Sequence, residues 1–130
     1  MTKGNNTSST GRYFAGIDGG GTSTEACVTD DQGKVLGTGR GGPSNVHYGG
    51  ESQLKDSVKT ALDQALSAAG LSLNDLSAGC AALAGAGREQ DRQRIRTALK
   101  PITGDIPLLV VEDTHSALAA AHKGRDGMVI

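Results

Sequence analysis

The sequence predicts an α/β domain built on a mixed five-stranded sheet with helices packed against it. Three short runs of strand-forming residues come first and are joined by tight turns, which is typical of an antiparallel meander. Two further apolar runs alternate with stretches of helical periodicity, which is typical of strands joined by crossover helices. The expected order is β-β-β-α-β-α-β-α, followed by the start of another strand at Met128–Ile130.

The first three strands follow one another with short connections. They are predicted over Tyr13–Ile17, Thr22–Thr29 and Lys34–Gly39. The residues Asp30-Asp31-Gln32-Gly33 have the types that favour a hairpin turn. Strands joined in this way pair antiparallel with their neighbours.

A loop and an amphipathic helix follow the third strand. Gly41–Gly50 contains Gly-Gly-Pro-Ser-Asn and is predicted to be a loop. In Glu51–Ala69 apolar residues recur at helical spacing, at Leu54, Val58, Ala61, Leu62, Ala65, Leu66 and Ala69. Gly70 is a typical residue for ending such a helix.

The rest of the chain alternates strand and helix. Ala78–Ala84 is a continuous apolar run, as expected of a strand covered on both faces. The elements predicted after it are a charged helix over Arg88–Lys100, a connector over Pro101–Pro107, a strand over Leu108–Val111 and an Ala-rich helix over Thr114–His122.

Composition excludes several classes of function. The net charge of −1 argues against a module that binds nucleic acid by neutralising phosphates. Two Tyr, one Phe and no Trp leave little material for stacking on bases. No apolar run approaches the roughly 20 residues that cross a bilayer. We therefore expect neither a nucleic-acid partner nor a membrane.

The N-terminus and the cysteines indicate the compartment. Residues 1–11 are polar and of low complexity, without the apolar core of a secretory signal, so we expect a disordered tail on a cytoplasmic protein. Cys27 and Cys80 lie far apart and have no metal-type spacing. Two buried free thiols are expected, with a disulfide as the open alternative.

The most informative segment is Gly16-Ile17-Asp18-Gly19-Gly20-Gly21-Thr22. Three successive glycines let backbone N–H groups approach an anion, and Thr22 can add a hydroxyl donor. Asp18 at the strand end is placed to hold Mg²⁺ through water. The alternative is a tight hairpin turn, which needs fewer glycines. The 20 glycines of the chain are about twice the average share, and we expect their clusters at strand ends, where α/β proteins bind ligands.

The motif GIDGGGT, opening a β-hairpin, resembles the first phosphate loop of the actin-like superfamily of sugar kinases and chaperone ATPases. The likeness is strongest to N-acetylglucosamine and glucosamine kinases and the related BadF/BadG-type ATPases. Gly42-Pro43-Ser44-Asn45 is similar to their sugar-contacting segment, and Leu83-Ala84-Gly85-Ala86-Gly87 to their next glycine loop. Val110-Val111-Glu112-Asp113 with the Ala-rich stretch after it resembles the strand and helix that carry the catalytic aspartate.

The resemblance spans about Tyr13 to Ile130 and implies a ribonuclease H-like fold, that of an actin-like ATPase domain. It implies that Asp113 is the catalytic base, which accepts the proton of a sugar hydroxyl as that hydroxyl attacks the γ-phosphoryl group. An Asp before an Ala-rich helix also suits an N-cap, and the two roles are compatible. Glu112 stands where the family commonly has Asn or Thr.

Three further residues are candidate sugar ligands. The Asn45 amide suits sugar hydroxyls, although a plain turn residue is an equal alternative. Gly85 and Gly87 could admit the sugar close to the backbone, or could form an ordinary strand-to-helix turn. His47 is expected to be a surface-loop histidine, and the charges from Arg88 to Lys100 are expected to form a solvated helix face.

The resemblance implies an ATP- and Mg²⁺-dependent kinase that phosphorylates N-acetylglucosamine or glucosamine at the 6-hydroxyl. Kinases of this kind have two similar domains with ATP between them. Residues 12–130 are therefore expected to be the N-terminal domain, ending before the second phosphate loop, inactive alone, and partnered by a second kinase domain. A homodimer is left open.

Two other functions remain at this stage. One is the ATPase activator of a radical dehydratase, which needs cysteines for an iron–sulfur cluster, and Cys27 and Cys80 in predicted strands are poorly suited to that task. The other is a non-catalytic sugar-binding fragment.

Overall fold

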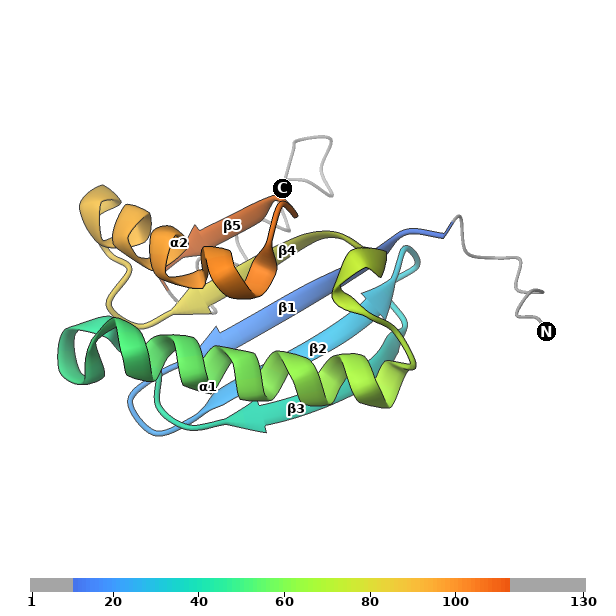
Figure 1. Ribbon diagram of the computed structural model, residues 1–130, viewed down its shortest axis with the longest axis horizontal. Coiled ribbons are helices and arrows are strands. Elements are labelled where there is room, and N and C mark those ends of the chain that lie inside the picture. The colour runs from blue at the N-terminus through green and yellow to red at the C-terminus, as the bar shows by residue number, and fades with distance from the viewer. Residues whose placement is uncertain (1–10, 113–130) are drawn as a thin grey trace.

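The computed structural model describes residues 11–112, and it contains a five-stranded sheet with both α-helices on one face (Figure 1). The predicted helix over Thr114–His122, the strand from Met128 and all of the N-terminal tail except Gly11 lie outside these residues. Among the residues described, no helix combines the length and hydropathy that crossing a membrane requires.

The sheet is mixed, as predicted. Its strands are β1 (Tyr13–Gly19), β2 (Thr24–Asp30), β3 (Val35–Gly41), β4 (Leu76–Leu83) and β5 (Leu108–Val111), and its helices are α1 (Val46–Ala69), the short 3-10 helix η2 (Leu73–Asp75) and α2 (Glu89–Thr103). The strands are arranged in the order β3-β2-β1-β4-β5. The pairs β1–β2 and β2–β3 are antiparallel, whereas β4 is parallel to both β1 and β5.

Helix α1 begins earlier than predicted. Its first turn starts at Val46, inside the segment predicted to be a loop, and the Asn45 side chain caps it by accepting from the His47 backbone N–H. Gly50 then adopts φ 76° and ψ −177°, which interrupts the helix. The predicted start at Glu51 marks the longer part of α1 after this kink, and no helical periodicity marks the first turn in the sequence.

Helix α2 ends later than predicted, because Pro101 lies within it rather than starting the connector. Proline removes one N–H donor and normally ends a helix. In α2 the missing N–H lies in the last turn. The carbonyl that it would have bonded belongs to Thr97, which is exposed. Thr103 donates its hydroxyl to the Leu99 carbonyl, and Gly104 donates its N–H to the Lys100 carbonyl, so the last turn remains bonded.

Three glycines of β3 allow α1 to lie directly on the strand backbone. Gly37, Gly39 and Gly41 alternate along β3 and face the helix. A Cβ atom added to any of them would overlap a backbone carbonyl oxygen of α1, those of Ala65, Ala61 and Ser57 respectively. The expectation that glycine clusters occur at strand ends and not within strands is therefore wrong for β3, because here the missing side chains provide room for a helix.

The core lies between the sheet and the two helices. Its fully buried members come from both layers and include Val28, Leu54, Val58, Leu62, Leu83, Ile95, Leu99 and Val110. Apolar side chains removed from water in this way contribute about 25 cal/mol per Å². The positions that the helical periodicity predicted to be apolar in α1 all face this core, with Ala69 only partly buried at its end.

No described helix covers the opposite face of the sheet. Gly16 on β1 pairs with Cys27 on β2 and with Cys80 on β4, so both thiols flank this glycine on that face. They lie two strand spacings apart, about 9–10 Å between Cα atoms, which exceeds the span of a disulfide. Both cysteines are free, as expected, but they are half-buried rather than buried. Burial raises the pKa of the Cys80 thiol.

Substituting Gly39→Ala should lower the free energy of unfolding by about 3 kcal/mol, because the new methyl group would displace α1 from the sheet. Chemical denaturation of the protein measures the change. Gly42→Ala is the matched control, since a Cβ atom there would lie 3.4 Å from the Ser57 hydroxyl and meet no backbone. Equal stability of the two variants would contradict close packing of α1 on β3.

Candidate functional site

One edge of the sheet collects the loops that the sequence singled out. Strands β1, β3, β4 and β5 all end there, since β3 is antiparallel to β2 and β2 is antiparallel to β1. Figure 1 shows this edge at the left, where α1 and α2 also begin. Ligands of α/β proteins bind outside the carboxyl ends of the strands, so this edge is the candidate site.

The glycine loop after β1 contains two kinds of glycine. A Cβ atom on Gly19 would overlap the Ser44 hydroxyl and lie 2.7 Å from Leu83 Cδ2, so packing requires glycine there. Gly20 and Gly21 do not have positive φ, and a Cβ atom on either would meet nothing within 4 Å. Neither the backbone nor the packing of residues 11–112 requires glycine at these two positions, and both adjoin the exposed residue Thr22. The space beside them is open to a ligand.

Buried hydrogen bonds fasten the glycine loop to the loop after β3. The Thr24 hydroxyl donates to the Gly42 carbonyl at 2.6 Å and lies 2.7 Å from the Ser44 hydroxyl. Because Thr24 has a single hydroxyl proton, Ser44 donates in the second bond. The Ser44 backbone N–H donates to the Gly20 carbonyl at 2.9 Å. Both side chains are fully buried, so the two loops are held in one arrangement.

Asn45 and Gly85, predicted independently as sugar ligands, are in contact. Gly85 has a φ of 93°, and a Cβ atom on it would lie 2.7 Å from Asn45 Oδ1 and 3.0 Å from His47 Cδ2. The Asn45 oxygen accepts from the His47 backbone N–H at 2.9 Å, which identifies the other end of the amide as its nitrogen. No group in residues 11–112 accepts a hydrogen bond from that nitrogen. Within residues 11–112, therefore, the two N–H donors of the Asn45 amide have no acceptor, and the oxygen of that amide lies against Gly85.

His47 and Asp91 form a polar cluster that the sequence did not predict. His47 Nε2 lies 3.2 Å from the Gly85 carbonyl oxygen and 3.4 Å from Asp91 Oδ1. Asp91 is buried, although the charged residues of α2 were predicted to be solvated. Its burial acts to raise the pKa of the carboxyl group, but the hydrogen bond and charge of Arg88, with the His47 ring, outweigh burial and lower that pKa. Asp91 lies one helical turn before the buried residue Ile95. This spacing is the feature of the sequence that could have placed Asp91 on the buried face of α2.

The end of β5 lies beside Gly87 at the same edge of the sheet. A Cβ atom on Gly87 would lie 3.3 Å from Glu112 Oε2. The glycine loop after β4 therefore adjoins the last described residue of the chain. Asp113, the predicted base, is the next residue and lies outside the described range, so its role stays a prediction.

Asp18 lies apart from Asn45. It pairs with Glu25 in the β1–β2 ladder, on the sheet face that carries Cys27, and it is exposed. Glu25 itself lies 3.7 Å from the Arg40 guanidinium. Within residues 11–112, no three His, Cys, Asp or Glu side chains gather as a metal-binding group. The exposed carboxylate of Asp18 at the end of β1, with Glu25 opposite it, fits Mg²⁺ that is held largely by water and phosphate oxygens.

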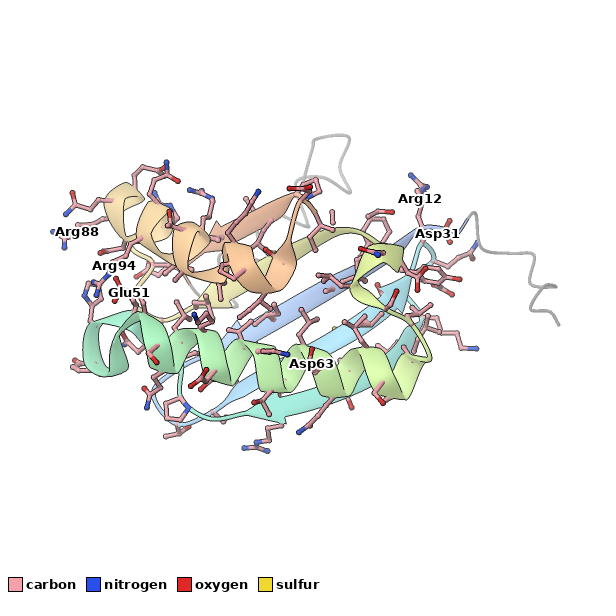
Figure 2. All side chains as sticks on the ribbon, viewed as in Figure 1. Arg12, Asp31, Glu51, Asp63, Arg88 and Arg94 are labelled. Atoms are coloured by element: carbon pink, nitrogen blue, oxygen red, sulfur yellow. The ribbon has the colours of Figure 1, made fainter. Side chains whose placement is uncertain are left out.

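An ion pair joins the starts of α1 and α2. Arg94 donates to both oxygens of Glu51, through Nε and through Nη2, the latter at 3.0 Å. Figure 2 shows Glu51, Arg94 and Arg88 together at the end of the molecule where the glycine loops lie. The hydrogen bonds from Arg94, aided by the backbone of Glu51, lower the pKa of Glu51 from 4.5 to about 2.

Comparison with known proteins places this arrangement in a family. The BadF/BadG/BcrA/BcrD ATPase family matches residues 15–130. The chain is 31% identical over 119 residues to the N-acetylmuramic acid/N-acetylglucosamine kinase of Clostridium acetobutylicum and covers 39% of that protein. It is 33% identical over 118 residues to the glucosamine kinase GspK of Vibrio cholerae and covers 40% of it. These alignments include 92% and 91% of the present chain.

A solved structure supports the same assignment. A Chromobacterium violaceum protein provisionally named an N-acetylglucosamine kinase superposes with a TM-score of 0.62 at 27% identity. The match covers 87% of the present chain and 39% of that protein. The predicted fold, a ribonuclease H-like domain of the actin-like ATPase type, is confirmed. The chain thus spans about two fifths of the length of the curated relatives it matches.

Substituting Gly21→Ala should weaken binding of nucleotide phosphate while leaving the free energy of unfolding unchanged or raised by up to about 1 kcal/mol. Calorimetric titration with ATP and a thermal melt measure the two quantities. Gly19→Ala is the contrasting variant and should destabilise the protein, because its methyl group overlaps Ser44. If Gly21→Ala destabilises the protein as much as Gly19→Ala does, Gly21 is structural.

Substituting Glu51→Gln should lower the melting temperature near neutral pH, because the ionised form of Glu51 is the form that folding stabilises. The stabilisation is complete above pH 4.5 and is lost as the pH falls toward about 2. The difference in melting temperature between the wild type and Glu51→Gln should therefore shrink over this range. A difference that does not vary with pH would contradict the ion pair as its source.

Proposed function

The chain belongs to the BadF/BadG/BcrA/BcrD ATPase family, and we propose that it forms the phosphate-loop and sugar-loop part of an ATP-dependent amino-sugar kinase. The observation that carries the proposal is the bond between the two loops. Ser44 precedes Asn45 directly, and its hydroxyl and backbone N–H hold the β3–α1 loop against Thr24 and Gly20. A ligand phosphate beside Gly20 and a sugar beside Asn45 would then have a defined separation.

The phosphate side of the site uses backbone donors. Gly20 and Gly21 leave open space at the end of β1, and Thr22 is exposed beside them. Closely spaced N–H groups without intervening side chains bind phosphate oxygens well. Asp18 would hold Mg²⁺ through water, and the ion would supply positive charge to the oxygens of the transferred phosphoryl group.

The sugar side of the site uses the free end of the Asn45 amide. Its two N–H donors suit hydroxyl oxygens, and an acetamido carbonyl equally well. Gly85 lies against this amide and Gly87 lies beside Glu112, and neither glycine adds a side chain of its own to the site. The relatives named as N-acetylglucosamine and glucosamine kinases support these two sugars as substrates. We propose the 6-hydroxyl as the acceptor.

Asp113 is the proposed catalytic base. It would accept the proton of the attacking hydroxyl while the phosphoryl group transfers, a step in which position matters more than basicity when the transition state is loose. Its neighbour Glu112 contacts the Gly87 loop, which supports a position at the sugar side of the edge. The relatives are more than twice as long as this chain, so we propose that the 130 residues alone do not turn over.

A coupled ADP-release assay tests the proposal. The product of the complete reading frame, with ATP and Mg²⁺, should release ADP in response to N-acetylglucosamine or glucosamine, and phosphorus NMR should place the phosphate on the 6-oxygen. The 130-residue chain should show no turnover, and Asp113→Ala in the complete protein should reduce kcat by about 10²–10⁴-fold. Absence of sugar-dependent ADP release would refute the kinase, and an unaffected Asp113→Ala variant would refute the base.

A further inference from the structure

We propose that His47, anchored by Asp91, is a positioning residue that holds the β4–α2 loop against Asn45 and thereby sets the affinity for the amino sugar. This inference rests on the proposed function, because it concerns the same sugar side of the site. Nothing in the sequence distinguished His47 from a surface-loop histidine. The contacts around it are what assign the role.

The buried residues Ser44 and Val46 fix the base of the first turn of α1, and the contacts of Asn45 and His47 determine how its exposed side is oriented. Gly50 interrupts the helix, so the turn that starts at Val46 does not inherit its direction from the longer part of α1. Val46 is buried, but His47 and Tyr48 are exposed. The orientation of Asn45 at the start of this turn therefore depends on the cap and on what His47 binds.

The His47 ring bridges that turn to two other elements. Its Nε2 atom faces the Gly85 carbonyl oxygen at 3.2 Å and Asp91 Oδ1 at 3.4 Å. Both partners are acceptors, so Nε2 carries a proton whether the ring is neutral or charged. One donor thus connects α1 with the loop after β4 and with α2.

Asp91 provides the fixed end of this connection. Its side chain is only 8% exposed, and Oδ2 accepts from Arg88 Nε at 3.2 Å while Oδ1 faces His47. Ile95, one turn further along α2, is fully buried in the core. The His47 ring, which is 39% exposed, is therefore attached to a packed helix and not to another surface group.

The connection bears directly on the sugar ligands. Gly85 is packed against both Asn45 Oδ1 and the His47 ring, closely enough that a Cβ atom would collide with the first and crowd the second. Ala84 and Ala86 remain bonded to Gly19 and Arg92. Releasing the Gly85 carbonyl from His47 would therefore let Gly85 itself shift away from Asn45. The Asn45 donors and the Gly85 backbone would then no longer be held at one fixed distance from each other where the ligand binds.

Steady-state kinetics of the complete protein tests the inference with three variants. His47→Ala should raise KM for the sugar about tenfold, the effect of losing a hydrogen bond that includes a charged partner. The KM for ATP and kcat should change by less than about twofold, because the phosphate side is untouched. His47→Gln, whose amide nitrogen reaches a similar position and donates, should restore most of the affinity for the sugar.

Glu51→Gln is the matched control. It also removes a link between α1 and α2, but one that does not touch Asn45 or Gly85. It should leave KM for the sugar unchanged. The inference is overturned if His47→Ala leaves KM for the sugar unchanged, if Glu51→Gln raises it equally, if kcat and both KM values change together, or if His47→Gln restores nothing.

A second measurement separates this inference from the proposed function. If the complete protein phosphorylates no sugar, the kinase fails, but the bridge can still be tested by amide hydrogen exchange. The Tyr48 and Gly49 amides donate to the Asn45 carbonyl, and the Ala86 amide donates to Leu83. These three amides should exchange faster in His47→Ala and at the wild-type rate in His47→Gln. Unchanged exchange in His47→Ala would refute the bridge.

Discussion

The close approach of α1 to β3 is the constraint on which the other features depend. It is possible because Gly37, Gly39 and Gly41 present bare backbone to the helix. A helix that rests on a strand backbone cannot shift sideways without losing many contacts at once, since protein interiors are closely packed. The longer part of α1, after Gly50, is consequently fixed against the sheet.

Two buried hydroxyl groups then hold the neighbouring loops in the arrangement that forms the candidate site. Thr24 and Ser44 are fully buried, and an unpaired polar group in such a position would cost about 1–3 kcal/mol. They satisfy one another and the Gly42 carbonyl, so the glycine loop and the β3–α1 loop have one low-energy arrangement. The site does not depend on long flexible side chains. It depends on a helix held against a strand, on two loops bonded below the surface, and on backbone left uncovered above it.

Much of the fold was predictable, because the patterns that specify it are local. Strand patterns, turn residues and helical periodicity identified the five described strands and the two α-helices in order and implied a mixed sheet, but not the short 3-10 helix η2. The errors fell where tertiary contacts outweigh local preference. Pro101 is tolerated in α2 because the bonds of Thr103 and Gly104 complete the last turn, and the first turn of α1 exists because Asn45 caps it.

The site was predictable at its backbone positions and less so at its side chains. The glycine loop, Asn45 and Gly85 stand out by composition, and the structure brings Asn45 and Gly85 together. Ser44 and His47 were missed, because a serine and a histidine in a loop carry no distinctive pattern. Asp91 was missed because its charge outweighed the helical spacing that relates it to the buried residue Ile95. Their importance arises from partners distant in sequence, such as Gly85 for His47 and Thr24 for Ser44.

The two roles that the sequence left open for Asn45 are compatible, because they use different atoms of the same residue. Asn45 was either a turn residue or a sugar ligand. Its oxygen caps α1, which is the structural role, and its nitrogen has no acceptor in the described part of the chain, which leaves the binding role free. The cap also makes the amide a better ligand, since an amide held by its oxygen presents its two donors in one direction and loses less conformational entropy when a ligand binds. The cap of α1 and the proposed sugar binding therefore use one side chain, and replacing it should remove both.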